Sequence, residues 1–251
     1  MEQSFSIFPL GDSAITIDLG NRIDGRLNRK ALDIYAVLRE LRLPGVKDII
    51  VAYSSVSILY DPVSLLRGLP AVPARREQAF GYMKGILEGA WQKVAGCRTR
   101  EETSSSDDSD SLIIRIPVCY EAEYGPDLEL LVREKGLPRE DIIRLHTSPA
   151  YRVYMIGFLP GFPYLGKVDP GLEIRRKDKP VPVVAGGVGI AGTQTGIYPL
   201  NSPGGWQILG RTPFKLFDPY ADSPVRLKTG DCVQFFSITK KEFQNLAADL
   251  N

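Results

Sequence analysis

The stretch from Tyr151 to Pro213 limits the possible folds of this chain more than any other, because regular helices and strands rarely hold glycine, proline and aromatic residues at such density. Glycine adopts backbone conformations that other residues resist, so this stretch must contain tight turns or points of close backbone approach. Loops of this composition are often binding surfaces, although the turns of a barrel also require them. Its clustered glycines are Gly186, Gly187, Gly189, Gly192, Gly196, Gly204 and Gly205.

Strand-like segments and turns alternate about every eight to fifteen residues through the second half, a spacing that predicts a β-barrel or β-sandwich. After the first of these strands, Asp127–Lys135 is predicted as a short helix capped by its first residue and closed by Gly136. Pro138 is expected at the first position of a helix that runs towards His146, and a terminal helix over Phe243–Leu250. The predicted strands are Leu112–Val118, Val153–Phe158, Val183–Ile190, Gln207–Leu209, Phe214–Phe217, Val225–Leu227 and Cys232–Ile238.

The N-terminal part predicts a small sheet backed by two helices. Apolar and polar residues alternate over Ile15–Leu19, which is the pattern of a half-buried strand. Apolar residues then repeat at helical spacing over Leu27–Leu41, and a Leu-Pro-Gly sequence ends that helix. Two further strands over Val46–Val51 and Ser55–Tyr60 and a second helix over Ala74–Val94 complete this part.

The sharpest change in composition lies between the two parts. The sequence EETSSSDDSDS is acidic, rich in serine and devoid of large apolar residues, so residues 96–111 are predicted to form a solvated linker. This linker would separate an N-terminal α+β domain over residues 1–95 from a β-barrel domain over residues 112–251. The expected fold class is therefore α+β.

Composition and charge exclude several classes of protein. Hydrophobic residues make up 43% and charged residues 24% of the chain, as in soluble globular proteins, and a net charge of +1 gives no electrostatic support for nucleic-acid or membrane binding. No apolar run approaches the ~20 residues that span a bilayer, and no signal peptide is expected. Cys97, Cys119 and Cys232 are odd in number and widely spaced, which suits a reducing compartment. The chain is expected in the cytoplasm.

Two glycine patterns resemble nucleotide-binding motifs without their structural context. Gly187-x-Gly189-x-x-Gly192 matches the dinucleotide fingerprint, but the residues that follow cannot open the helix whose N-terminus binds the pyrophosphate. The segment Gly161–Val168 is one residue from a P-loop, but Val168 stands where Ser or Thr would bind Mg²⁺. ATP binding by this route is not expected.

His146 is the only histidine of the chain. A His-rich zinc site is therefore excluded, the cysteine spacings do not support a Cys-rich one, and no metal site is predicted. In a functional role His146 would act as a general acid or base or would orient a substrate carbonyl. The alternative is a packed histidine at a helix end. No GxSxG nucleophile elbow is present, so a self-contained serine amidase is not expected.

The loop YPLNSPGGW, residues 198–206, has the composition of a binding surface. Its two prolines stiffen it, and the aromatic residues at its ends offer flat amphipathic faces. Ser202 supplies a hydroxyl, and the N–H groups of Gly204 and Gly205 could bind a carboxylate or an oxyanion. Turn packing is the alternative interpretation. A basic run nearby, interpreted as a solvated strand edge or an anion site, consists of Arg175, Arg176, Lys177 and Lys179.

Two long motifs point to a known family. HTSPAYRVYMIGFLPGFPYLG (146–166) and GIAGTQTGIYPLNSPGGWQILGRTP (189–213) resemble, in order and separation, motifs of the B subunit of prokaryotic 5-oxoprolinase. PLGDSAITIDLG (9–20) resembles the opening strand of that family, and LPGVKDIIVAYSSVSILYDP (43–62) its next β-hairpin. The resemblance covers nearly the whole chain, and the same family includes KipI-type histidine-kinase inhibitors and "allophanate hydrolase subunit 1" proteins.

This resemblance implies an N-terminal α/β domain followed by a cyclophilin-like β-barrel. It also implies a subunit, inactive alone, of an ATP-dependent enzyme that opens 5-oxoproline to L-glutamate. The lactam is a stable amide, so phosphorylation of its carbonyl oxygen by ATP would create a leaving group. The implied partners are a homologous barrel protein, the KipA-type C subunit, and a LamB/YcsF-type A subunit, with ATP bound at the level of the complex.

Residues of the family motifs, together with the basic run, supply the candidate site. His146, Tyr198 and Ser202 are the candidate catalytic residues, and either His146 or Tyr198 would polarise the substrate carbonyl while an arginine holds a carboxylate. The site is expected in a pocket at the partner interface. The candidate substrate-binding residues are Phe158, Phe162, Tyr164, Arg175, Arg176, Gln194, Thr195, Gly204, Gly205, Trp206 and Arg211.

The chain departs from the family pattern at two places. Lys179-Pro180 stands where Pro-Arg commonly follows the basic pair, and Val184–Gly187 replaces a Pro-Ala-Gly-Ser turn. The missing arginine weakens the prediction of a carboxylate clamp, so a substrate other than 5-oxoproline is one alternative. Others are a KipI-type inhibitor of a sensor histidine kinase, which would use the same loops, and an accessory subunit of an allophanate hydrolase or urea carboxylase system.

Overall fold

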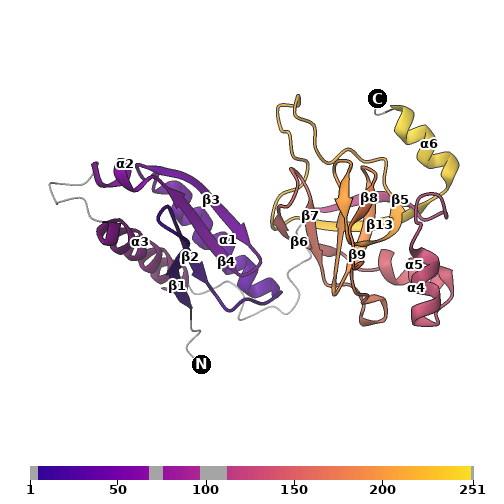
Figure 1. Ribbon diagram of the computed structural model, residues 1–251, viewed down its shortest axis with the longest axis horizontal. Helices are drawn as coiled ribbons and strands as arrows, with labels where there is room; N and C mark the ends of the chain where they lie inside the picture. The colour runs from indigo at the N-terminus through magenta and orange to yellow at the C-terminus, as the bar shows by residue number, and fades with distance from the viewer. Residues whose placement is uncertain (1–4, 68–75, 97–111, 250–251) are drawn as a thin grey trace. The chain divides into compact units, whose positions relative to one another are not determined.

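The structure, a computed structural model, describes residues 5–67, 76–96 and 112–249 (Figure 1). Contacts between Cα atoms divide the chain into two units, Met1–Ser109 and Asp110–Asn251. The predicted linker over residues 96–111 lies outside the described residues except for Gly96, which ends a helix. The predicted domain limits therefore stay a prediction.

The first unit contains an antiparallel sheet with the strand order β1-β2-β4-β3. Alternate residues of the two central strands, including Ile15, Ile17, Val56 and Ile58, are completely buried in a core that they share with helix residues. The period of two that predicted these strands therefore reflects one face packed against helices. The strands are β1 Ser6–Pro9, β2 Ala14–Asp18, β3 Val46–Ala52 and β4 Ser55–Tyr60.

Two long helices contact this sheet, as predicted. The first, α1 (Gly25–Glu40), begins after Asp24, whose carboxylate accepts hydrogen bonds from the first turn, with 2.8 Å to the backbone nitrogen of Arg26. The second is α3 (Arg76–Gly96). A short helix, α2 (Pro62–Arg67), follows β4 where only the end of a strand was expected.

The second unit is built on a closed barrel of seven strands in the order β10-β7-β6-β13-β5-β12-β9 (Figure 1). The first and last of these strands along the chain, β5 and β13, lie side by side and run parallel, whereas the other neighbouring pairs are antiparallel. Closure removes the exposed strand edges of an open sheet. The strands are β5 Ile113–Cys119, β6 Tyr151–Ile156, β7 Pro163–Gly166, β9 Gly187–Ala191, β10 Gln194–Ile197, β12 Gln207–Arg211 and β13 Cys232–Ile238.

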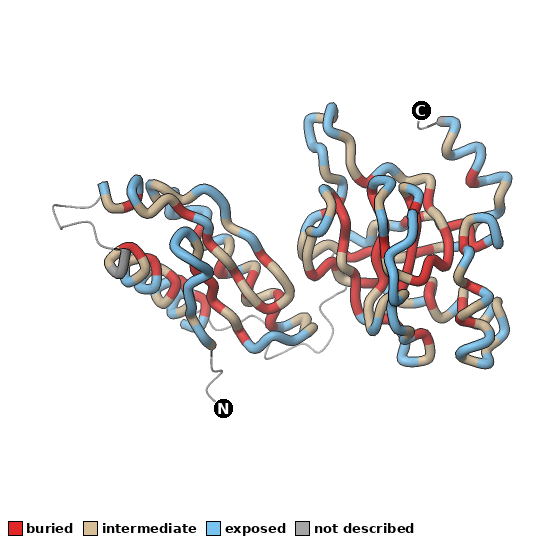
Figure 2. The backbone as a smooth tube through the Cα atoms, in the orientation of Figure 1, coloured by how far each residue is buried: buried red, intermediate tan, exposed pale blue. Residues whose placement is uncertain are grey.

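Apolar side chains from these strands and from two adjacent helices form the core of the second unit. Figure 2 shows the buried positions recurring along the strands. Among the completely buried residues are Ile116, Val153, Leu165, Val188 and Val233. The remaining helices are α4 Leu128–Lys135, α5 Arg139–Thr147, the 3-10 helix η1 Pro170–Leu172, and α6 Lys240–Asp249.

A two-stranded ribbon lies outside the barrel. Strand β11 (Ser202–Gly204) pairs antiparallel with β8 (Val181–Val183), so that Pro203 lies opposite Pro182. Proline has no backbone N–H to donate, and a short ribbon tolerates it because neither strand has a partner on its other side. Pairing of β8 with β11 places the segment that precedes β8 next to the YPLNSPGGW loop, which contains β11.

Several strands differ from the prediction. Phe214–Phe217 and Val225–Leu227 were predicted wrongly: they form an irregular pair of segments with a single bridge between Phe217 and Val225. Pro224, just before Val225, has no backbone N–H to donate to a neighbouring strand. Its carbonyl accepts a hydrogen bond from the Asp218 nitrogen at 2.8 Å. The single strand predicted over Val183–Ile190 is divided, because Val183 ends β8 and β9 begins at Gly187. Conversely, β1, β7, β10 and β11 were not predicted, the last three because their glycines and prolines resembled turns.

The two helices before β6 differ slightly from expectation. Asp127 occupies the N-cap position of α4, but its side chain makes no capping hydrogen bond, because its carboxylate is engaged elsewhere. Gly136 closes this helix in the left-handed conformation, with φ of 63°, as predicted. Pro138 lies one position earlier than expected, as the N-cap of α5.

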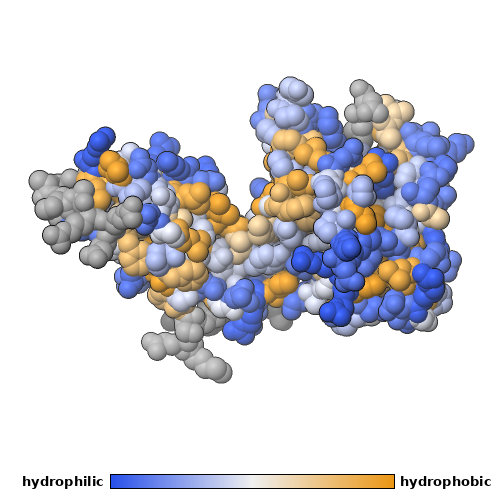
Figure 3. All heavy atoms as spheres, in the orientation of Figure 1, coloured by the Kyte–Doolittle hydropathy of each residue, from blue (hydrophilic) through white to orange (hydrophobic). Residues whose placement is uncertain are grey.

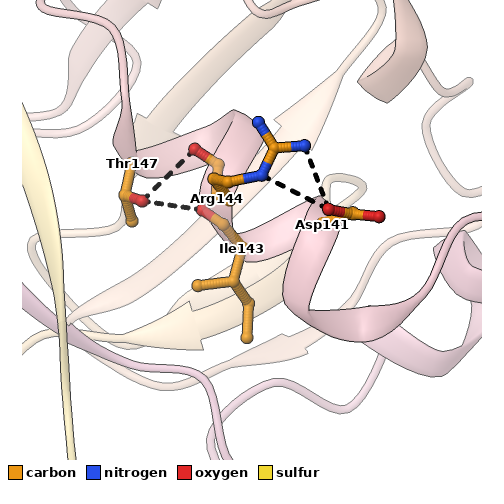
Figure 4. Close-up of polar contacts among 4 residues, drawn as sticks. All are labelled: Asp141, Ile143, Arg144 and Thr147. Atoms are coloured by element: carbon orange, nitrogen blue, oxygen red, sulfur yellow. Dashed lines mark hydrogen bonds and ion pairs between the residues drawn. The ribbon is translucent and has the colours of Figure 1, made fainter.

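Polar side-chain contacts run along the solvent-facing side of α5 (Figure 4), the helix that also contains His146. Arg144 forms an ion pair with Asp141 at 3.0 Å. Thr147 closes the helix by donating its hydroxyl to the carbonyl of Ile143 at 2.8 Å. These solvent-facing contacts leave the opposite side of the helix, with the buried Ile142 and His146, for the barrel core.

Candidate functional site

A cavity of about 200 Å³ lies beside the β8–β11 ribbon. Its walls come from the turn after β6, the loop before β8, the end of β10, and the segment from β11 to β12. Six of the predicted site residues line it. The other four lining residues, Lys177, Asp178, Pro180 and Pro203, were not predicted as site residues. The ten lining residues are Phe158, Arg176, Lys177, Asp178, Pro180, Tyr198, Pro203, Gly204, Gly205 and Trp206.

An aromatic cluster forms one wall of the cavity. The ring of Tyr198 meets the edge of Phe162 at 5.1 Å between centroids, and Phe162 meets Trp206 at 5.4 Å. Tyr164 contacts Trp206 at 5.9 Å between ring centroids. Phe162 and Tyr164 are therefore not lining residues but support the two rings that are.

Tyr198 is almost completely buried, with 1% of its surface exposed. Burial raises the pKa of its phenol above the ordinary value of 10.0, although a hydrogen bond from the Trp206 backbone lowers it. The phenol is therefore protonated at neutral pH and can donate a hydrogen bond. Gly204 makes the close approach of this ring possible, since a Cβ atom at Gly204 would lie 2.4 Å from the phenol oxygen.

Phe158 stands at the rim of the cavity in a strained backbone conformation. Its φ is 67°, which non-glycine residues rarely adopt, and 62% of its surface is exposed. A tight turn holds it there, because the Gly157 nitrogen donates to the Phe162 carbonyl at 3.1 Å and Gly161 also has a positive φ, 81°. Strain of this kind concentrates at functional sites, so the rim position agrees with a binding role.

The basic residues divide into those at the cavity and those away from it. Arg176 and Lys177 line it, together with the acidic Asp178. Arg211 does not: its Nε donates to the carbonyl of Ala185 at 2.8 Å, and its guanidinium lies 5.7 Å from the Phe243 ring centre. Arg175 also lies outside the lining, and its carbonyl accepts a hydrogen bond from Gln207 at 3.0 Å. Two of the three predicted carboxylate-binding arginines are thus not at the cavity.

Three further predicted residues also lie outside the lining. Ser202 is in the ribbon next to the lining residue Pro203, and its Oγ is buried without a hydrogen bond to any residue within the described ranges. Gln194 and Thr195 begin strand β10 of the barrel. Figure 3 shows hydrophobic groups scattered among hydrophilic ones on the visible face of the second unit.

His146 lies inside the barrel core and not at the cavity. It is completely buried and stacks on Phe235 at 4.8 Å between ring centres. Its Nδ1 is 2.8 Å from the Tyr120 hydroxyl, and its Nε2 is 2.9 Å from the Thr195 hydroxyl. The Tyr151 hydroxyl donates to its backbone carbonyl at 2.9 Å. Both ring nitrogens are therefore engaged by other side chains.

These contacts determine the tautomer of His146. The Thr195 hydroxyl donates its single hydrogen to the carbonyl of Gly189 at 3.0 Å, so it can only accept from the histidine. Nε2 consequently carries the proton, and Nδ1 accepts from Tyr120. Burial lowers the pKa of His146 to about 3, so the ring is neutral at physiological pH.

We expect Thr195→Val to destabilise the second unit by about 1–3 kcal/mol, because valine keeps the shape but leaves the buried N–H of His146 without an acceptor. Thr195→Ser keeps the hydroxyl and serves as the control, with a smaller loss. Urea unfolding at pH 7 measures both free energies of unfolding. Equal losses for the two variants would show that the hydroxyl is not the important group.

The described part of the chain does not meet the requirements of a metal site, a membrane-spanning helix or a dinucleotide-binding turn. Within residues 5–67, 76–96 and 112–249, no group of three or more His, Cys, Asp or Glu side chains is arranged to hold a metal ion. No helix in these ranges is both long and apolar enough to cross a membrane. The glycines of the fingerprint-like pattern lie on barrel strand β9 and the turn after it, and do not precede a helix.

Comparisons with known proteins agree with this architecture. The family profile "Carboxyltransferase domain, subdomain C and D" matches residues 5–227. The chain is 35% identical to the B subunit of 5-oxoprolinase from Bacillus subtilis over 252 residues, which cover 100% of both proteins.

Two crystal structures are similar in fold and sequence. A conserved uncharacterized protein from Pyrococcus horikoshii, PH0987, is 37% identical, with a TM-score of 0.51 over 95% of this chain and 100% of that one. The structure of TTHA0988 is 33% identical, with a TM-score of 0.70 over 90% of this chain and 40% of that one. The present chain thus spans about 40% of the length of TTHA0988. The likeness and the closed barrel confirm the predicted fold class, a small α+β sheet unit followed by a β-barrel.

Proposed function

This chain belongs to the family of 5-oxoprolinase B subunits, and from that premise we propose that it is one component of an enzyme complex that opens 5-oxo-L-proline to L-glutamate with hydrolysis of ATP. The observation that carries the proposal is the similarity to the Bacillus subtilis protein over the full length of both chains. The proposed partners are a LamB/YcsF-type A subunit and a KipA-type C subunit. The cytoplasm is the proposed compartment.

The cavity beside the β8–β11 ribbon is the proposed substrate site of this subunit. 5-Oxoproline combines a flat lactam ring with a carboxylate, and the cavity is lined by aromatic residues and by Arg176. Arginine binds carboxylates through charge-assisted hydrogen bonds. The backbone of Gly204 and Gly205 lies in the same wall, without side chains to keep a ligand away.

Tyr198 is the proposed donor to the lactam carbonyl, which is the role that sequence alone shared between Tyr198 and His146. Its phenol is protonated at neutral pH, since burial raises its pKa further above the ordinary 10.0, and Tyr198 lines the cavity. A donor of this kind would orient the carbonyl so that its oxygen can attack the γ-phosphate of ATP, with ADP as the leaving group. His146 has both ring nitrogens engaged within the core, so its proposed role is to hold β10, the strand that precedes Tyr198.

Glutamate release from 5-oxoproline and ATP tests the proposed function. The measurement uses the three proposed subunits together and each mixture that lacks one. We expect release only from the complete mixture. Activity without this chain, or an inert complete mixture, would contradict the proposal.

Arg176→Gln is expected to raise the KM for 5-oxoproline roughly 10- to 100-fold, because a charge-assisted contact of about 1.5–3 kcal/mol is lost. Its neighbour Arg175, which is also exposed but does not line the cavity, provides the matched control. Arg175→Gln should change the KM by less than about twofold. Equal effects at the two positions would mean that the cavity is not the carboxylate site.

A further inference from the structure

Asp127 connects the start of α4 to the wall of the cavity. Its Oδ2 accepts a hydrogen bond from the Ile208 nitrogen at 2.7 Å, and its own nitrogen donates to the Ile208 carbonyl at 3.0 Å. The same Oδ2 forms an ion pair with Lys177, which lies in the loop before β8. The two side chains are 17% and 19% exposed, so the pair is largely shielded from water.

Lys177 is attached to the segment between β11 and β12 by its backbone as well as by its side chain. Its nitrogen donates to the Gly205 carbonyl at 2.6 Å, and its Nζ donates to the Trp206 carbonyl at 3.1 Å. On the other side of Arg176, the carbonyl of Arg175 accepts from the Gln207 side chain at 3.0 Å. Both neighbours of Arg176 are therefore tied to the segment that forms the facing wall.

From this arrangement we infer that Asp127 and Lys177 form a positioning pair, which aligns Arg176 and the Gly205–Trp206 backbone for an anionic ligand. The aliphatic part of the Arg176 side chain runs along the backbone of Gly205, since a Cβ atom added to Gly205 would lie 3.9 Å from the Cδ of Arg176. Only the identity of the ligand as 5-oxoproline rests on the proposed function. The pair itself rests on the contacts of the chain.

The pair also sets the charge of the cavity. Asp127 compensates Lys177, whereas Arg176 forms no ion pair with any residue in the described ranges. Asp178 adds a carboxylate to the lining. Removing the Asp127 charge would leave a second, shielded cation next to Arg176, and electrostatic attraction at such a site is stronger than in bulk water. An anion would then be attracted by two cations but would no longer be held in one orientation.

Fluorescence quenching of Trp206 tests the charge compensation without any assumption about the reaction. The chain has two tryptophans, so Trp91→Phe leaves Trp206 as the single reporter in the cavity wall. At low ionic strength, Asp127→Asn should increase the iodide quenching constant at least about twofold and leave acrylamide quenching unchanged, since acrylamide is neutral. Unchanged iodide quenching would overturn the assignment of a compensated Lys177.

Hydrogen exchange tests the alignment in the same variants of the full chain. The Lys177 and Ile208 amides donate within the linked segments. They should exchange at least about tenfold faster in Asp127→Asn and Lys177→Met, while the amide of Leu165, in barrel strand β7, should keep its rate. Equal exchange rates at Lys177 and Ile208 in wild type and variants would overturn the positioning role.

Kinetics of the reconstituted complex then link the pair to the ligand. Lys177→Met should raise the KM for 5-oxoproline about tenfold and change kcat by less than about threefold, and Lys177→Arg should restore the KM. A variant that loses only thermal stability would show the pair to be structural. If the wild-type complex releases no glutamate, the proposed function fails, while quenching and exchange still decide the role of the pair.

Discussion

Replacing Gly204 by alanine is expected to reduce turnover of the complex at least about tenfold and to destabilise the second unit by about 1–3 kcal/mol. The new Cβ atom would lie 2.4 Å from the Tyr198 phenol oxygen and 2.6 Å from its ring carbon Cζ. Tyr198 cannot move aside easily, because it is 1% exposed and packs against Phe162. Thermal unfolding followed by Trp206 fluorescence, together with glutamate release, measures both effects.

The adjacent glycine provides the control for this substitution. A Cβ atom at Gly205 would have its nearest neighbour, the Lys177 carbonyl oxygen, at 3.6 Å, which is an ordinary contact. Gly205→Ala should therefore change the free energy of unfolding by no more than about 0.5 kcal/mol, which makes it a control for the stability effect. If both variants behaved alike, the distance between Gly204 and Tyr198 would not be what places the tyrosine.

The second unit is expected to lose stability steeply between pH 6.5 and pH 3 because of His146. Burial lowers the pKa of this histidine from 6.5 to about 3 in the folded protein. Between these values the unfolded chain binds a proton that the folded chain does not, so the free energy of unfolding falls as the pH falls. The slope is about 1.4 kcal/mol per pH unit, and the total is about 4–5 kcal/mol. The stabilisation is fully present above pH 6.5.

His146→Gln separates this effect from other acid titrations, because glutamine does not titrate but can still donate to Thr195. We expect the variant to be less stable at pH 7 and to show a flatter pH dependence from pH 6.5 down to pH 4. Tyr120 and Tyr151, which contact His146, stay neutral in this range, since burial raises their pKa values further above the ordinary 10.0. Urea unfolding in the Trp91→Phe background, followed through Trp206, gives the two curves. Parallel curves would mean that His146 binds protons equally in both states.

The helices and most strands could be predicted because their periodicity is set by a single buried face. In α1, Leu27, Ala31, Ile34 and Leu38 are all buried, and their spacing is visible in the sequence. The barrel strands β7 and β10 were missed for the opposite reason. Both contain glycine, and Gly196 is required because a Cβ atom there would lie 2.9 Å from the carbonyl oxygen of Pro163. Glycine in a strand is then a sign of close backbone approach, which composition alone does not distinguish from a turn.

The part of the site that could be predicted from sequence is the loop whose glycine, proline and aromatic residues indicate a shaped binding surface. The YPLNSPGGW loop does line the cavity, through Tyr198, Gly204, Gly205 and Trp206. The sequence could not show that His146 faces the core, because its burial depends on residues far away in the chain, such as Thr195 on β10. The pairing of Asp127 with Lys177 was hidden for the same reason. As a helix N-cap residue, Asp127 had a sufficient local explanation, and its actual partners lie on β12 and in the loop before β8.

The parallel contact between β5 and β13 has a consequence for synthesis of the protein. On the ribosome, β5 emerges first among the barrel strands and β13 last, yet β13 fills the space between β5 and β6. Until Cys232–Ile238 has left the exit tunnel, the nascent second unit has two strand edges without their final neighbour. Such edges can pair with other chains, so we expect the second unit to be more prone to aggregation during synthesis than the first unit, whose sheet is complete once β4 has emerged.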